Sequence, residues 1–128
     1  KIGLITNMTI PMQKREVEMT AYNLSQYFDL CLSAADIGHM KPHPLPFRLA
    51  LESLDVKAEE AIFIGDSPEH DVAGAHGVGM RAIWVRRESY AAIDSIHPDA
   101  TVDSLSEILG VLDSWQPGWR TPQTTELG

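Results

Sequence analysis

The segment AIFIGDSPEHDVAGAHGVG, residues 61–79, contains the clearest buried strand of the sequence and the group of residues that ends it. The apolar run at 61–64 predicts the strand, and Gly65 allows the chain to leave it sharply. Asp66 follows at the edge of the sheet, and Asp71 stands five residues later near the start of a short helix. Two carboxylates in this arrangement suit a hard cation that prefers oxygen ligands, such as Mg²⁺. Taken alone, the pattern fits equally well a structural role in which Asp71 only favours the helix N-terminus.

Strand-like and helix-like segments alternate on both sides of this segment. Short apolar runs predict further strands at residues 3–6, 30–33, 82–85 and 100–102. Apolar residues at helical spacing predict helices at residues 17–28, 47–54, 72–75 and 105–112. Such alternation implies an α/β domain, a parallel sheet covered by helices on both faces, with ligands beyond the carboxyl ends of the strands. We expect residues 1–113 to form this core and residues 114–128 to form a C-terminal tail.

Composition narrows the class of protein and of partner. The 128 residues, 44% of them apolar and 22% charged, suffice for one globular domain. A net charge of -8 argues against nucleic acid as a partner, and no apolar run approaches the roughly 20 residues that a membrane helix needs. The single cysteine, Cys31, excludes an internal disulfide, so we expect a buried thiol and a cytoplasmic location. Because a strand is predicted at the first residues and no methionine precedes it, we also expect residues to be missing upstream.

Polar residues also follow the first predicted strand and occupy the loop before the second long helix. The Thr6 hydroxyl and the backbone N–H of Asn7 could hold a phosphate oxygen, although an ordinary strand-end turn explains them as well. Lys41 precedes Pro42, which favours an extended backbone for the lysine and presents it from a defined loop. Its point charge suits phosphate. A solvated surface lysine is the alternative interpretation.

Together these segments form an ordered set that resembles three motifs of the haloacid dehalogenase-like (HAD-like) superfamily. Residues 4–7, LITN, resemble the second motif, and Lys41 with Pro42 resembles the third. Residues 62–79 resemble the fourth, which is the most specific. The resemblance covers roughly residues 1–110. It implies a three-layer, Rossmann-like fold and a hydrolase.

Within that superfamily the resemblance implies a role for each matched residue. Thr6 would bind the transferring phosphoryl group, and Lys41 would neutralise its charge and orient the nucleophile. Asp66 would bind Mg²⁺, and Asp71 would support Asp66 and the metal shell. The superfamily also includes metal-independent dehalogenases that lack the Gly-Asp arrangement. Gly65 and Asp66 therefore favour a Mg²⁺-dependent phosphatase that acts on a small phosphorylated substrate.

The superfamily's first motif, a strand ending in Asp-x-Asp that carries the nucleophile, does not occur in these 128 residues. The resemblance implies that this strand is central and lies between the strands that carry Thr6 and Asp66. The chain should therefore pair those two strands directly, leave a slot, or borrow a strand from a second copy or another polypeptide. Two functions stay open. One is a phosphatase whose nucleophile lies upstream of this chain, and the other is a module that holds phosphate or a partner without turnover.

Overall fold

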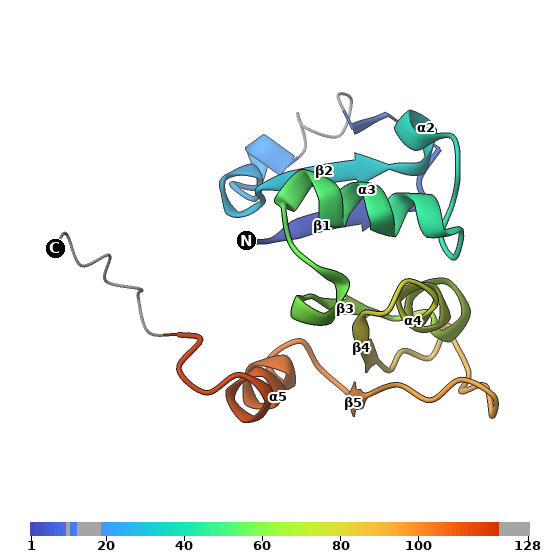
Figure 1. The fold of residues 1–128 in the computed structure, drawn as a ribbon, viewed down its shortest axis with the longest axis vertical. Helices are drawn as coiled ribbons and strands as arrows, with labels where there is room; N and C mark the ends of the chain where they lie inside the picture. Colours follow the sequence, from blue (N-terminus) through green and yellow to red (C-terminus); the bar gives the residue numbers. More distant parts are fainter. Residues whose placement is uncertain (10, 13–18, 121–128) are drawn as a thin grey trace, which may run out of the picture.

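A computed structural model describes residues 1–9, 11–12 and 19–120 of the chain (Figure 1). In this part of the chain the strands form two parallel sheets. Strand β1 (Gly3–Thr6) pairs with β2 (Leu30–Ser33), with Gly3 opposite Leu30 and Thr6 opposite Ser33. The second sheet has the order β3–β4–β5. Its strands are Ile62–Gly65, Arg81–Val85 and Ala100–Val102. The predicted α/β class with parallel strands is confirmed.

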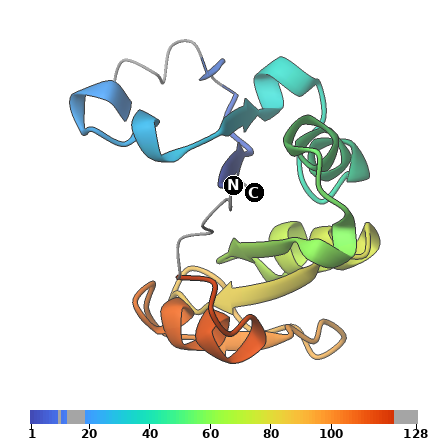
Figure 2. The ribbon, with the colours of Figure 1, turned by 60° about the vertical axis from the view of Figure 1, so that its left-hand side comes forward.

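The two sheets do not join in the described residues, because β1 and β3 are not paired. A cleft of about 1480 Å³ lies between them, with residues 1–5 on one wall and residues 60–66 on the other. Figure 2 shows the two sheets on either side of this space. We call the space between β1 and β3 the strand slot. Of the three arrangements expected from the sequence, direct pairing of the two strands is wrong, because a slot lies between them. The donation of a strand by another polypeptide stays a prediction.

Helix α3 (Pro44–Leu54) connects the two sheets by packing. It contacts β1 and β2 on one side and α4 (Gly74–Gly77) on the other. Phe47 on this helix is fully buried and meets the Phe63 ring of β3 edge-on, with ring centroids 4.9 Å apart. Buried aromatic pairs of this geometry add to the stabilisation from apolar burial. One apolar core therefore holds both sheets together on the α3 face.

The opposite face of the second sheet packs against α5 (Glu107–Trp115). Ile83, Val85 and Val102 from the strands and Ile108 from the helix form a second buried cluster there. The sheet is thus covered on both faces, as the alternating pattern predicts. Helix α5 runs on to Trp115, and residues 121–128 of the predicted tail lie outside the described residues. None of the described helices is long and apolar enough to cross a membrane.

The helix predicted at residues 17–28 is wrong in its second half. Val17 lies outside the described residues, and residues 19–21 are helical. Asn23 then takes a left-handed backbone with φ of 55°, which ends the helix. Residues Ser25–Tyr27 form a separate 3₁₀ turn. Two further short elements are helix α2 (Ala34–Ile37) and the 3₁₀ turn Ala58–Glu60.

Candidate functional site

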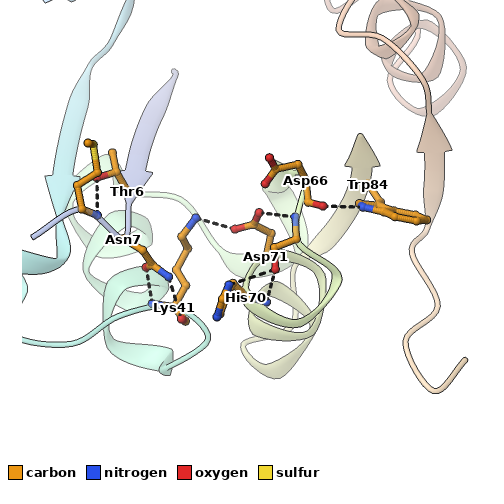
Figure 3. A network of polar contacts seen from close by, with 9 residues as sticks. Thr6, Asn7, Lys41, Asp66, His70, Asp71 and Trp84 are labelled. Carbon is orange, nitrogen blue, oxygen red and sulfur yellow. Dashed lines mark hydrogen bonds and ion pairs between the residues drawn. The ribbon is translucent and has the colours of Figure 1, made fainter. Parts of the chain in front are cut away.

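The predicted site residues converge on the carboxyl ends of β1 and β3 (Figure 3). Thr6 and Asn7 end β1, and Asp66 directly follows β3. Asp71 lies in the π-helical turn η3 (Pro68–Ala73), which begins two residues after Asp66. Lys41 comes from the loop between α2 and α3 and extends across to the second sheet. The structure therefore brings residues from three distant parts of the sequence to one edge of the molecule.

An ion pair lies at the centre of this group. The Lys41 Nζ atom is 2.6 Å from Oδ1 of Asp71, and the two side chains are only 11% and 6% exposed. The other carboxylate oxygen of Asp71, Oδ2, accepts a hydrogen bond of 3.0 Å from the Ser67 N–H. Charge-assisted hydrogen bonds of this kind are among the stronger ones in proteins. Asp71 is therefore held in place by Lys41 from the loop before α3 and by Ser67 from the segment after β3.

Gly65 is required for this arrangement. A Cβ atom at this position would collide with the side chain of Asp71, including its Oδ2 and Cγ atoms. The glycine predicted to let the chain leave β3 therefore also makes room for the buried carboxylate. Close approach of another group to the backbone is a common reason for a glycine at a strand end.

Asp66 differs from Asp71 in its surroundings. The residue is exposed, and its backbone oxygen accepts a hydrogen bond of 2.8 Å from Nε1 of Trp84, whose side chain is almost buried. This bond fixes the main chain of Asp66 against β4. In Figure 3 the Asp66 carboxylate points away from Trp84, towards the side on which Thr6 and Lys41 lie. Asp66 thus presents an open carboxylate on a fixed backbone.

Of the two aspartates predicted to bind a metal ion, Asp66 is better placed to do so than Asp71. In the part of the chain that the structure describes, no group of three or more His, Cys, Asp or Glu side chains could hold a metal ion. Mg²⁺ commonly uses only one or two carboxylates and completes its shell with water and substrate phosphate. Asp66 fits that role, whereas Asp71 is already bonded to Lys41 and Ser67. Asp66 could therefore supply one carboxylate ligand to Mg²⁺.

The two residues at the end of β1 differ in what they bind. The Thr6 hydroxyl oxygen accepts a hydrogen bond of 3.2 Å from the Met8 N–H, as in a strand-end turn, and its own proton can still be donated. The side chain of Asn7 instead binds the main chain of Lys41 through two hydrogen bonds of 2.8 and 3.1 Å. From the sequence, only the backbone N–H of Asn7 is expected to take part in the site. Asn7 and Lys41 are 34 positions apart, and no local sequence pattern indicates their contact.

Ser67 is a second residue whose role the sequence did not reveal. Its N–H binds Asp71, and its hydroxyl oxygen accepts a hydrogen bond of 3.1 Å from the His70 N–H, which caps η3. The His70 ring atom Nδ1 lies 3.2 Å from the same hydroxyl. A serine before a proline at the start of a helical turn is a recognisable capping signal that could have been used.

Comparison with known proteins places this geometry in a family. The family model described as haloacid dehalogenase-like hydrolase matches residues 1–85. Pyrophosphatase PpaX of Bacillus mycoides (strain KBAB4) is 35% identical over 88% of this chain and 52% of its own length. Pyrophosphatase PpaX of Bacillus cereus (strain G9842) is 34% identical over 89% of this chain and 52% of its own length. The chain therefore spans about half the length of the curated relatives it matches.

Solved structures agree with the family match. A 2-haloacid dehalogenase from Pseudomonas syringae pv. Tomato DC3000 superposes with a TM-score of 0.75 at 38% identity, covering 88% of this chain and 46% of that one. A HAD phosphatase from Thermococcus onnurineus superposes with a TM-score of 0.76 at 32% identity, covering 88% of this chain and 50% of that one. The chain belongs to the haloacid dehalogenase-like hydrolase family.

Proposed function

We propose that this chain is the C-terminal part of the core of a Mg²⁺-dependent phosphatase that acts on a small phosphate ester. The observation that carries the proposal is that the buried Lys41 ammonium group and the exposed residue Asp66 lie at the same edge of the molecule, where Thr6 ends β1. Phosphoryl transfer depends mainly on positioning and on stabilisation of negative charge, and a fixed lysine with a metal-binding carboxylate serves both needs. The names of the pyrophosphatase and phosphatase relatives support the same reaction class.

Each residue has a definite task in this proposal. The Thr6 hydroxyl would donate a hydrogen bond to a phosphoryl oxygen, together with the Asn7 backbone N–H. Lys41 would neutralise charge on that group while Asp71 holds the ammonium in place, and the Ser67 N–H in turn holds the Asp71 carboxylate. Asp66 would hold Mg²⁺, which when bound supplies further positive charge beside the phosphoryl group. The nucleophile would be an aspartate on a strand upstream of this chain, because no Asp-x-Asp occurs among these 128 residues.

The strand slot supports a related proposal about partners. Both walls of the slot carry unpaired strand edges in the described residues, and such edges accept a further strand. We expect an extended strand to fill the slot, from the upstream segment or, in its absence, from a second copy of the chain or another partner. Light scattering that finds only a stable monomer of residues 1–128 would count against the second and third sources. The cytoplasmic location stays a prediction from the sequence.

The phosphatase proposal can be tested on the protein carrying its upstream segment. With Mg²⁺ it should hydrolyse a generic ester such as p-nitrophenyl phosphate, and Asp66→Asn should abolish turnover. Asp94→Asn, at an exposed position outside the site, is the matched control and should retain activity. Unchanged activity in Asp66→Asn would refute the assignment. Halide release from a 2-haloacid without added metal would instead indicate a dehalogenase.

A second function is favoured by the same slot and by the absence of Asp-x-Asp from this sequence. The chain would then hold phosphate or a partner without catalysis. It predicts that residues 1–128 bind inorganic phosphate in the presence of Mg²⁺ but do not turn over an ester. Turnover by this purified chain that is lost in Asp66→Asn would contradict it.

A further inference from the structure

The side chain of Asn7 makes two hydrogen bonds to the main chain of one distant residue. Its Oδ1 accepts from the Lys41 N–H at 2.8 Å, and its Nδ2 donates to the Lys41 carbonyl at 3.1 Å (Figure 3). Both contacts are partly buried. The side-chain amides of Asn and Gln carry an acceptor oxygen and a donor nitrogen in one plane. Asn7 therefore matches both main-chain polar groups of Lys41 at once.

These two hydrogen bonds fix the backbone end of the Lys41 side chain, which is otherwise flexible. A lysine side chain has several rotatable bonds and loses rotamer entropy when its ammonium group is held in one place. At the far end Asp71 holds the Nζ atom at 2.6 Å, and Asn7 holds the backbone at the near end. Neither the loop that carries Lys41 nor its neighbour Pro42 pairs with a strand in the described part of the chain. Asn7 is thus the link that joins this loop to the end of β1.

The contacts form a continuous path across the strand slot. The path runs from Asn7 at the end of β1 through Lys41 to Asp71, and from Asp71 to the Ser67 N–H after β3. No backbone pairing joins β1 to β3 among the described residues, so these polar contacts connect the two sheets at the edge where the site lies. Loss of the Asn7 link would free the loop and let the ammonium group move.

We propose that the Asn7 side chain is a positioning residue for Lys41, acting on phosphate through the lysine and not by touching it. This inference rests on the proposed phosphate site but has observables of its own. It predicts that Asn7→Ala increases the exchange rate of the Lys41 amide hydrogen about tenfold, because that N–H loses its acceptor. Asn7→Asp keeps an acceptor oxygen but loses the Nδ2 donor, so its exchange rate should lie between those of Asn7→Ala and the unsubstituted chain.

The test uses the 128-residue chain with Mg²⁺ and inorganic phosphate as the probe. Asn7→Ala should weaken phosphate binding about tenfold and speed chemical acetylation of the Lys41 amine. In a Lys41→Met background, Asn7→Ala should cause no further loss of phosphate affinity, which separates a role through Lys41 from a general loss of structure. Gln26→Ala, an exposed amide outside the site, is the control and should change none of these values.

Two results would overturn the inference. One is a Lys41 amide exchange rate that is unchanged in both Asn7→Ala and Asn7→Asp. The other is a loss of phosphate affinity that persists in full when Lys41 is already methionine, because Asn7 would then act directly on the ligand. If the unsubstituted chain fails to bind phosphate, the phosphate proposal fails, while amide exchange and acetylation still decide the role of Asn7. If Asn7→Ala does not fold, the same measurements on Asn7→Asp decide it.

Discussion

The Lys41–Asp71 ion pair allows the electrostatics of the site to be measured as a free energy. With side-chain exposures of 11% and 6%, neither charge is solvated well enough to stand alone. Removing one partner of a buried pair costs about 3–5 kcal/mol because the other charge is left uncompensated. Asp71→Asn and Lys41→Met should each lower the free energy of unfolding by about that amount. The double variant removes both charges and should be more stable than the sum of the single effects predicts, by about 2–3 kcal/mol.

Urea unfolding followed by circular dichroism would measure this coupling. With an m-value of about 1–3 kcal/mol/M for a domain of this size, a loss of 3 kcal/mol lowers the urea midpoint by about 1–3 M. The exposed pair Arg86–Asp103, with side-chain exposures of 55% and 62%, is the matched control. The cycle of Arg86→Met and Asp103→Asn should show much weaker coupling, because solvent screens the charges. If the two cycles gave equal coupling, or if the Lys41 and Asp71 effects were additive, the pair would not be the buried contact described above.

Two further predictions concern packing and acid stability. Gly74→Ala would bring a Cβ atom to 2.6 Å from Cζ of Phe47 and should cost about 1–3 kcal/mol in thermal unfolding. Gly110→Ala in α5, where nothing lies within 4 Å, should be neutral or stabilise by about 0.5–1 kcal/mol, and the reverse order would contradict the packing of α3 on α4. A hydrogen bond from the Met12 N–H lowers the pKa of Asp36 in the folded chain. The ionised Asp36 carboxylate therefore stabilises the fold at pH values above its pKa in the unfolded chain. This stabilisation is lost as the pH falls through the lower pKa of the folded chain. Asp36→Asn should therefore flatten the fall in stability on acidification measured by urea unfolding, and an unaltered acid slope would refute that role.

The sequence predicts most of the strands because each is a short apolar run. The runs at 30–33 and 100–102 correspond to β2 and β5 residue for residue. It also predicts which residues reach the edge of the sheet, since the carboxyl ends of parallel strands lie together. It does not predict the left-handed backbone of Asn23 that ends the first helix, because asparagine is also compatible with a helix interior.

The sequence predicts which residues lie in the site better than it predicts which of them contact one another. Lys41 and Asp71 are 30 positions apart, and Asn7 and Lys41 are 34 apart. Such pairings are set by how α3 packs across both sheets, not by any periodicity along the chain. The same holds for Gly65. A side chain is excluded at this position because the Asp71 carboxylate packs against it, and only the structure shows that contact.

The charges of the site give an independent argument for a cation in the proposed reaction. Asp71 already neutralises Lys41 at 2.6 Å, so the ion pair as a whole offers little net attraction to an anion. The nearby Asp66 carboxylate adds a negative charge at the same edge, on a chain whose net charge is already -8. A phosphate group would therefore meet net repulsion from these three side chains, and like charges in a partly dehydrated site are costly. A divalent cation on Asp66 would reverse the sign of the site, which makes Mg²⁺ a condition for phosphate binding in this proposal and not only an aid to turnover.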